Sequence, residues 1–415
     1  MDFEDGTTHG GGRLVDAAAD WLMAQALDDT DVRGLVQGIC TRLVAAGIPL
    51  WRVNLAFTTL HPLVSAISVT WHRDVGLSVD GIEHSRDESP AWAISPYKHV
   101  IENGLPYLRR RLVGDDAQFD FPILTELRQK GATEYLAIAT RFRPAASERR
   151  FSDGIVVSWA TDRGDGFNEQ DLKSILRIQR RLAVACKVAI LSDTASNIAT
   201  TYLGAGAGSK VLTGQIQRGA HETIHAAIWY SDMRGSTHLA DTLPSAEFLA
   251  LLNAYFECTA GAVMANGGEV LMFIGDAVLA IFPTDRHDGG GLDACARAVA
   301  AAGDAVARLD AANAARAEMG ADPIAFGIAV HVGEVMYGNI GVPERLEFSV
   351  VGPAVNEVVR LEGLTKILRR PILVSGPVAA ALDRAWEDLG SHALRGVGEP
   401  VEVFAPVTDA AVVAA

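Results

Sequence analysis

Cysteine is scarce in this chain of 415 residues. The four cysteines lie far apart and form neither a Cys-x-x-Cys pair nor a dense framework; they are Cys40, Cys186, Cys258 and Cys295. A small secreted scaffold held by disulfides would need a denser pattern. We therefore expect reduced, buried thiols in a cytosolic protein.

Long hydrophobic runs are also lacking. No apolar run reaches the roughly 20 residues that a membrane-spanning helix needs. The N-terminus is acidic and Gly-rich, without the basic and apolar regions of a signal peptide. The sequence therefore predicts a soluble, cytoplasmic protein without a membrane partner. Residues 1–20 are expected to form a flexible acidic leader.

Positive charge is the third shortage. The chain has 36 Lys and Arg residues against 51 Asp and Glu residues, which gives a formal net charge of −15 at pH 7. A general nucleic-acid binder would need a basic surface to neutralise phosphates. The charge argues against such a partner and leaves open a small nucleotide that is bound through metal ions. With 49% hydrophobic residues, the chain can bury the cores of two or three domains.

Two aspartates each lie at the end of an apolar strand. Asp232 follows the strand that begins near Ile228, and Asp276 lies in a Gly-Asp pair between two apolar segments. The second pattern predicts a β-hairpin with Asp276 at its tip. If these strands lie side by side, both carboxylates leave the same edge of one sheet. Hard divalent cations prefer oxygen ligands, so the pair predicts a two-metal site for phosphoryl chemistry.

Residues 21–167 predict a small α/β domain of the sensor type. The expected elements are a helix at 32–46 and strands at 52–59, 67–71, 134–140 and 155–160. Three segments resemble parts of a GAF domain. Gly131–Ile138 resembles the start of one of its strands, and Gly154–Trp159 and Gly166–Leu172 resemble its C-terminal part. A PAS-like or an unrelated α/β fold is the alternative. The resemblance implies an unknown small-molecule ligand for this domain.

Three consecutive arginines lie in the variable middle of this domain. Arg109, Arg110 and Arg111 predict either an anion site or a solvated basic edge. A solvated edge is the more common role of such a charge run, so it is the interpretation that we prefer.

A long helix is expected after Asn168, which is a good N-cap residue. Apolar residues recur within it at alternating steps of three and four, namely Ile175, Ile178, Leu182, Ala185 and Ala189. This spacing predicts either the seam of a coiled coil or a helix that faces a core. Glycines at positions 204, 206 and 208 then indicate a linker. Residues 168–221 are thus expected to form a signalling helix and a Gly-rich linker.

Seven motifs follow in order between residues 222 and 408. They are Ser231–Thr237, Gly267–Val270, Phe273–Asp276, Gly338–Gly341, Phe348–Glu362, Leu394–Gly396 and Pro400–Phe404. Together they resemble the catalytic domain of class III nucleotidyl cyclases, and such an ordered set is hard to obtain by chance. The resemblance implies a ferredoxin-like catalytic domain, and hence an α/β chain overall.

The resemblance also implies roles for particular residues. Asp232 and Asp276 would hold two Mg²⁺ or Mn²⁺ ions, which activate the ribose 3′-hydroxyl and neutralise charge on the triphosphate. Asn356 would orient the ribose, and Arg360 would meet the charge that develops on the α-phosphate. The substrate phosphates would meet the turn of Met233, Arg234, Gly235, Ser236 and Thr237. The two metal carboxylates come from one chain and the Asn and Arg from its partner in this family, which implies a homodimer with two sites.

Two positions depart from the family pattern. Purine-selecting members carry Lys four residues before the second metal Asp and Asp or Thr seven residues before the Asn, or Glu and Cys for guanine. These base-selecting positions hold Met272 and Ser349 here. A thioether cannot donate a hydrogen bond to a purine nitrogen, and a hydroxyl that donates or accepts discriminates little. The residues that would bind metal and stabilise the transition state match the family pattern, whereas the two residues that would recognise the base do not.

We therefore predict an enzyme that converts a nucleoside triphosphate, ATP first, to its 3′,5′-cyclic monophosphate and pyrophosphate under regulation by the N-terminal domain. GTP or a pyrimidine nucleotide is the alternative substrate. A catalytically weak domain that binds nucleotide as a regulatory module is the alternative function. A heterodimer, in which a second cyclase chain supplies the missing Lys, also stays open. Asn356 and Arg360 weaken the case for a relative of metal-dependent nucleotide polymerases.

Restoring the base-reading Lys tests the role of Met272. A lost base contact costs about 1 to 3 kcal/mol of selectivity, so Met272→Lys is expected to raise kcat/KM for ATP by roughly 5- to 150-fold. Steady-state kinetics with ATP and CTP would measure this change, with Met272→Leu as a control of similar volume that has no donor. An unchanged ATP turnover would show that backbone groups read the base.

Overall fold

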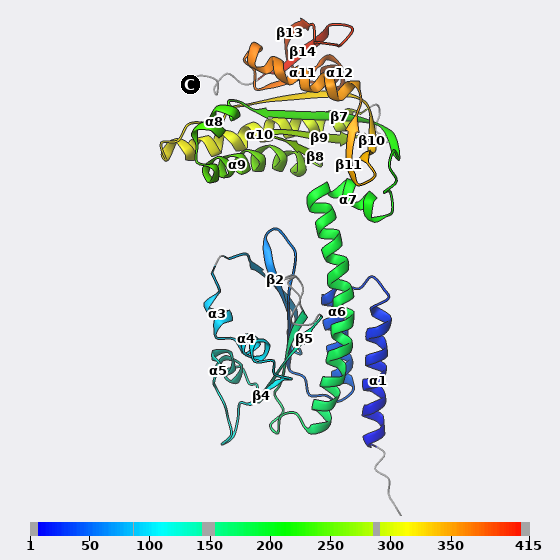
Figure 1. The fold of residues 1–415 in the computed structure, drawn as a ribbon, viewed down its shortest axis with the longest axis vertical. Helices are drawn as coiled ribbons and strands as arrows, with labels where there is room; N and C mark the ends of the chain where they lie inside the picture. Colours follow the sequence, from blue (N-terminus) through cyan, green and yellow to red (C-terminus); the bar gives the residue numbers. More distant parts are fainter. Residues whose placement is uncertain (1–6, 86, 143–153, 285–290, 408–415) are drawn as a thin grey trace, which may run out of the picture. The chain divides into compact units, whose positions relative to one another are not determined.

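The computed structural model describes residues 7–85, 87–142, 154–284 and 291–407. It divides the chain into two compact units, Met1–Ile198 and Ala199–Ala415. Each unit has its own β-sheet with helices packed against it (Figure 1). The expected α/β fold is thus confirmed. Residues 1–6 of the expected leader and residue 408, the expected end of the catalytic domain, lie outside the described residues.

In the described residues of the first unit, six strands form one antiparallel sheet. The strands are β1 (Arg52–Thr58), β2 (Val64–His72), β3 (Gly76–Glu83), β4 (Leu108–Arg111), β5 (Glu134–Arg141) and β6 (Gly154–Thr161). The helices are α1 (Thr7–Gln25), α2 (Val32–Ala45), α3 (Pro90–Ala93), α4 (Pro96–Glu102), α5 (Pro122–Gln129) and α6 (Glu169–Leu203). The strand order in the sheet is β3-β2-β1-β6-β5-β4.

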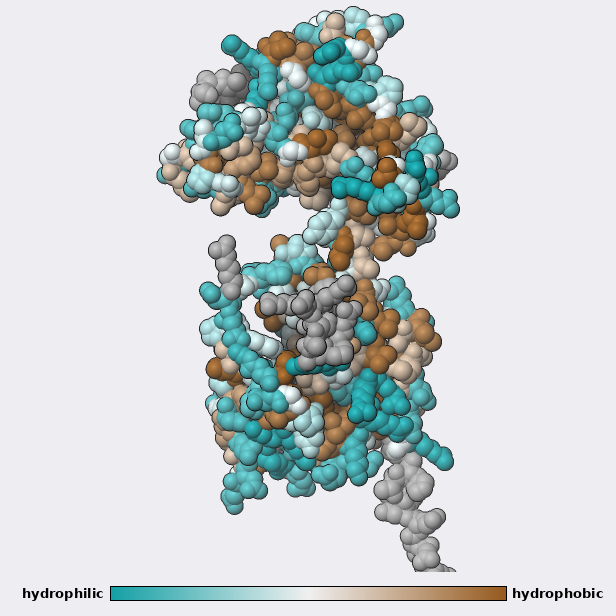
Figure 2. Space-filling view, in the orientation of Figure 1, coloured by the Kyte–Doolittle hydropathy of each residue, from teal (hydrophilic) through white to brown (hydrophobic). Residues whose placement is uncertain are grey.

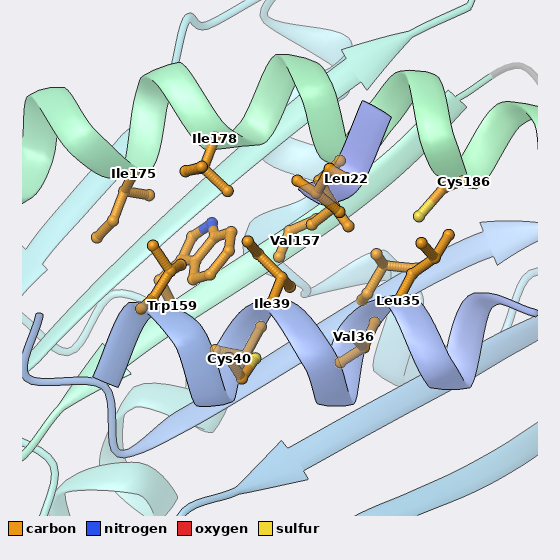
Figure 3. Close-up of a cluster of buried hydrophobic side chains, with 14 of the residues drawn as sticks. Leu22, Leu35, Val36, Ile39, Cys40, Val157, Trp159, Ile175, Ile178 and Cys186 are labelled. Carbon is orange, nitrogen blue, oxygen red and sulfur yellow. The ribbon is translucent and has the colours of Figure 1, made fainter. Parts of the chain in front are cut away.

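The sheet of the first unit buries both of its faces because side chains alternate along its strands. Val157 and Trp159 face a core that α1, α2 and α6 cover. Figure 3 shows Ile175 and Ile178 of α6 pointing toward these strand residues and toward Ile39 of α2. Strand residues that point to the other face, such as Tyr135, pack against α4 and α5. The unit therefore has three layers, with the sheet in the middle.

The prediction of a flexible leader is wrong from Thr7 onward. Residues 7–25 form α1, and four of its residues are buried in the core: Val15, Ala18, Ala19 and Leu22. Their spacing is that of one face of an amphipathic helix. The burial of this face holds α1 against the rest of the unit. The glycines and acidic residues at the N-terminus obscured this pattern in the sequence.

The five residues that were candidates for a coiled-coil seam are not available to a second helix. Ile175, Ile178, Leu182, Ala185 and Ala189 are 0–7% exposed, and all of them belong to the core of their own unit. The alternative interpretation, a helix that faces a core, describes them correctly. Side-chain periodicity alone could not separate the two because both require the same spacing.

The expected Gly-rich linker is wrong as well, because Ala205–Leu212 form helix α7. A carboxylate oxygen of Glu269 accepts hydrogen bonds from the backbone N–H of Ala207, at 3.0 Å, and from the hydroxyl of Tyr337, at 2.7 Å. A Cβ atom added to Gly206 would lie 2.3 Å from the other oxygen of this carboxylate. Glycine thus permits close packing of α7 here rather than chain flexibility.

The second unit contains α7 and an eight-stranded sheet. The strands are β7 (His221–Met233), β8 (Glu269–Ile274), β9 (Ala277–Pro283), β10 (Phe326–Val342), β11 (Arg345–Val351), β12 (Ile372–Ser375), β13 (Trp386–His392) and β14 (Val401–Pro406). The further helices are α8 (Ser236–Thr242), α9 (Ser245–Ala265), α10 (Leu292–Glu318), α11 (Pro353–Leu368) and α12 (Gly376–Ala381).

The strand order of this sheet is β13-β14-β12-β10-β7-β9-β8, and β11 pairs with β10. The segment from β7 to β10 follows the β-α-β-β-α-β order of a ferredoxin-like fold. Helices α9 and α10 cover one face of the sheet, and α7 and α11 cover the other. This arrangement places the carboxyl end of β7 next to the turn between β8 and β9.

The expectation that no apolar run is long enough to span a membrane does not hold for two helices. By length and composition alone, α6 and α9 pass that criterion. Both also supply core residues, for example Ile178 and Tyr255, which are fully buried. A core helix of a soluble domain has the same composition.

The arginine run is half-buried and paired with carboxylates rather than a solvated edge. Arg109 and Arg111 both pair with the buried carboxylate of Glu134, and Arg110 pairs with Asp120. These two carboxylates offset part of the charge of the run, and Arg109 also contacts Glu169 at 3.4 Å. The four cysteines are free and buried, as expected.

The structural role of α1 can be tested with two leucines of this helix. Leu22 is 0% exposed and Leu14 is 50% exposed. Leu22→Ala is expected to lower the free energy of unfolding of the first unit by about 2 to 5 kcal/mol, because it leaves a cavity in the core. Leu14→Ala is expected to change it by less than about 0.5 kcal/mol. Urea denaturation followed by tryptophan fluorescence measures both; equal effects would contradict the docking of α1.

Candidate active site

The two predicted metal ligands lie at one edge of the second sheet. Asp232 is the residue before the last in β7, where its register partners are Ala277 on β9 and Gly327 on β10. Asp276 directly precedes Ala277 and lies in the turn of the β8–β9 hairpin. The preceding Gly275 has φ 65°, a left-handed conformation that glycine adopts without strain. Strand register thus brings the two carboxylates together, as the sequence pattern predicts.

The electrostatics of this edge favour a cation. Burial raises the pKa of Asp232, and the charge of Asp276 and a hydrogen bond between the two carboxyl groups raise it further. The positive charges of Lys366 and Arg234 act in the opposite direction. Two carboxylates that repel each other at a half-buried edge fit a divalent cation, which would replace the repulsion by attraction to both.

The protein supplies only part of a complete coordination shell. The described residues contain no group of three or more His, Cys, Asp or Glu side chains that could hold a metal ion. The carboxylates of Asp232 and Asp276 would supply two oxygen ligands to an ion at this edge. An ion bound there would take its other oxygen ligands from water or from substrate phosphates, which is the usual mode for Mg²⁺.

Glu362 on α11 is a further acidic group near this edge that the sequence did not indicate. It is buried, and both burial and the charge of Asp232 raise its pKa. Its carboxylate accepts a hydrogen bond of 3.1 Å from the hydroxyl of Thr365. A Cβ atom added to Gly327 would lie 2.3 Å from a carboxylate oxygen of Glu362. The spacing of four between Glu362 and Lys366 was the available signal, because it places both on one helix face.

The turn that was expected to bind phosphate follows β7 directly. The Met233 side chain is buried in the core, so only its backbone is available to a ligand. The backbone N–H of Arg234 donates to the carbonyl of Ala325 at 2.8 Å. The Nε atom of Arg234 is buried and has no hydrogen-bond partner among the described residues. Gly235 has φ 72° and precedes α8, which begins with Ser236 and Thr237.

Asn356 and Arg360 share α11, and neither is among the groups that shift the pKa of Asp232. Asn356 is exposed, and the guanidinium of Arg360 lies beside Gly396. The neighbouring Glu357 contacts His331 Nε2 at 3.3 Å, and His331 Nδ1 lies 2.9 Å from the Ser375 hydroxyl. These contacts fix the first turns of α11 on the sheet.

The two base-selecting positions lie on strands that contact each other. Met272 is on β8, where it is half-buried and packs against the core between the sheet and α11. Ser349 is on β11, is buried and pairs in register with Gly338 of β10. Strands β8 and β11 are in contact. The structure therefore brings the two positions into one region of the second unit.

The site and the fold agree with a family match. Residues 219–404 match the model of the adenylate and guanylate cyclase catalytic domain. The second unit therefore carries a catalytic domain of the class III adenylate and guanylate cyclases. The expected family of this domain is confirmed.

Individual relatives are similar over the same region. An uncharacterised protein of Mycobacterium tuberculosis (strain CDC 1551 / Oshkosh) is 34% identical over 189 residues, which make up 45% of this chain and 32% of the relative. An adenylate cyclase of Anabaena cylindrica is 32% identical over 168 residues, 40% of this chain and 32% of the relative. The solved structure of a guanylyl cyclase is 30% identical and covers 44% of this chain and 92% of that one, with a TM-score of 0.39. The matched region spans about a third of the length of the two curated relatives.

Cation binding at the carboxylate pair can be measured without turnover. Mn²⁺ at about ten times its Kd is expected to stabilise the second unit by about 1.4 kcal/mol, seen as a rise in Tm. The double variant Asp232→Asn, Asp276→Asn is expected to lose this rise. Its Tm without metal should equal or exceed that of the wild type, because the repulsion between the carboxylates is removed.

The control for this measurement is Asp310→Asn, which removes an exposed carboxylate on α10. It is expected to keep the full response to Mn²⁺. An equal Mn²⁺ response in the double variant would show that the ion binds elsewhere.

Proposed function

We propose that this protein is a nucleotidyl cyclase that converts a nucleoside triphosphate, with ATP as the first choice, to its 3′,5′-cyclic monophosphate and pyrophosphate. The observation that carries the proposal is the pairing of Asp232 and Asp276 at one sheet edge within an adenylate and guanylate cyclase catalytic domain. The choice of ATP rests on the frequency of that activity in the family. The adenylate cyclase of Anabaena cylindrica among the relatives is consistent with it.

Asp232 and Asp276 are proposed to hold two Mg²⁺ or Mn²⁺ ions, which supply charge neutralisation and activation of the ribose 3′-hydroxyl when bound. Arg234 carries a buried Nε atom without a partner, which suits a hydrogen bond to a triphosphate oxygen. The backbone from Gly235 to Thr237 would add N–H donors. Asn356 would orient the ribose, and the always-charged Arg360 would meet negative charge on the α-phosphate.

These roles need two copies of the chain. In one copy, Asp232 is influenced by Lys366 and Arg234, whereas Arg360 lies beside Gly396. Asn356 is exposed and free to face a partner. A symmetric homodimer would bring Asn356 and Arg360 of one copy to the carboxylates of the other, and would hold two equivalent sites.

The first unit is proposed to act as a GAF-like sensor domain in a cytoplasmic enzyme. A cavity of about 550 Å³ supports a small-molecule ligand there. Phe57, Ile82 and Trp92 are among its lining residues, together with polar groups such as Arg141. Its size lies in the range of ligand pockets, and its mostly apolar lining is typical of them.

A regulatory module that binds nucleotide without turnover is the second candidate. Met272 favours it, because this side chain packs against the core and offers no donor to a base. Asn356 and Arg360 speak against it, since binding alone has no need for a group that meets transition-state charge.

Product analysis tests the proposal directly. The full-length protein is incubated separately with ATP, GTP, CTP and UTP in Mg²⁺ and in Mn²⁺, and products are identified by mass. One cyclic product is expected from the wild type and none from Asp276→Ala. Binding of a nonhydrolysable triphosphate in the absence of any product would favour the regulatory module.

A mixing experiment checks that the site is shared between two chains. Asp276→Ala and Arg360→Ala are each expected to be inactive alone. An equimolar mixture is expected to recover about a quarter of the wild-type activity, because about half of the dimers combine both variants and each of these has one intact site. A mixture that stays inactive, although the subunits exchange, would place all four groups in one chain.

A further inference from the structure

Helix α6 carries a second apolar stripe, on the face that its own unit leaves uncovered. We call it the outer stripe; it consists of Val184, Val188, Leu191, Ala195 and Ile198. All five are exposed, and the four larger side chains are 51%, 45%, 46% and 43% exposed in that order. Figure 2 shows hydrophobic residues among hydrophilic ones on the visible surface of the first unit. A patch of this kind on a soluble domain indicates an interaction surface.

The spacing of the outer stripe is that of a coiled coil. Its members follow one another at steps of four, three, four and three residues, and Tyr202, which is 82% exposed, continues the series after four more. Alternating steps of this kind give the 3.5-residue repeat of a heptad seam. The stripe assigns Val188 to an a position and Leu191 to a d position, a combination that favours two parallel strands.

The outer stripe is distinct from the buried residues that were first expected to form a seam. Leu182, Ala185 and Ala189 face the core of their own unit, with Cys186 and Ile190 beside them. In Figure 3, Ile175, Ile178 and Cys186 all point from α6 toward α2 and the sheet. The helix therefore uses one apolar face inside its own unit and keeps another free.

Charges limit the outer stripe at its N-terminal end. The two preceding positions of the heptad series hold Arg177 and Arg181, and Arg177 pairs with Asp16 on α1. At the other end, Gly204 ends the helix with φ 87°. The run from Val184 to Tyr202 is roughly 28 Å long at the rise of an α-helix. Such a short seam is marginal alone and suits an interface that a second contact supports.

We propose that two copies of this chain pair through the outer stripe, with their α6 helices parallel. A heptad seam is complementary to itself, so the same seam on a second copy can bury its apolar side chains without any other partner. In a parallel pair, Lys187 would face Ser192 of the other copy, so that no like charges meet across the seam. The orientation rests on the proposed function, because α6 leads into the catalytic unit and both catalytic units must meet.

Disulfide trapping in the full-length protein tests the pairing and its direction. Val184→Cys and Ile198→Cys lie at the two ends of the stripe, and each is expected to form a dimer on mild oxidation. An antiparallel pair would hold these ends apart and trap neither. The four native thiols are buried and should not form disulfides between chains. Burial raises the pKa of all four, that of Cys295 to about 11.

Ser196→Cys is the matched control, since Ser196 is exposed on the same helix but lies outside the stripe. It is expected to trap little dimer. Trapping at Ser196 as efficient as at Ile198, or trapping at only one end of the stripe, would overturn the proposal.

Sedimentation of a second variant gives an independent measurement. Leu191→Glu with Ile198→Glu is expected to raise the dimer Kd by roughly 100-fold or more, because like charges would meet across the seam. Ser196→Glu is expected to leave the Kd unchanged. Both sites are exposed, so the fold should survive, and circular dichroism checks this. An unchanged Kd in the double variant would overturn the proposal. None of these measurements needs a nucleotide. They therefore test pairing through the outer stripe separately from the proposed cyclase activity.

Discussion

The repulsion between two carboxylates at one sheet edge is the constraint on which the catalytic unit depends. The pairing of β7 with β9 places Asp232 beside Ala277. Asp276 directly precedes Ala277 in the hairpin turn, so it is held close to Asp232. Buried Glu362 adds a third acidic group nearby, whereas Lys366 and Arg234 offset only part of the charge. A fold that holds such a cluster in place by backbone pairing would be preorganised for cations. Preorganised charge of this kind contributes to catalysis because it needs no rearrangement during the reaction.

The packing of α11 supports the proposal that the site is completed by a second chain. Helix α11 is anchored by buried Val358, Leu361 and Glu362 and by the contact of Glu357 with His331. With these residues turned toward the sheet, Asn356 is left exposed. In the proposed homodimer, the carboxylate edge and the exposed side of α11 would be two half-sites of one unit. The proposed homodimer follows from this division, and the outer stripe of α6 would be its second contact.

The sequence predicted those features that local chemistry determines. The Gly-Asp hairpin and the strand end near Asp232 depend on turn preferences within a few residues. The family motifs then placed them in one domain. Glu362 was not found, because its proximity to Asp232 arises only when α11 packs over β10 and β7. Helix α1 was missed since three glycines precede its core residues and two aspartates lie between them.

Helix α6 shows the limit of periodicity most clearly. Its sequence contains two apolar series, one through Ile175 and Leu182 and one through Val184 and Leu191, and both have steps of three and four. Periodicity reports that a face is apolar but not what covers it. Only the packing of α2 and the sheet against the first series shows that the second is the one left for a partner. The same helix therefore stabilises the first unit with one face, and the other face is available to join two chains.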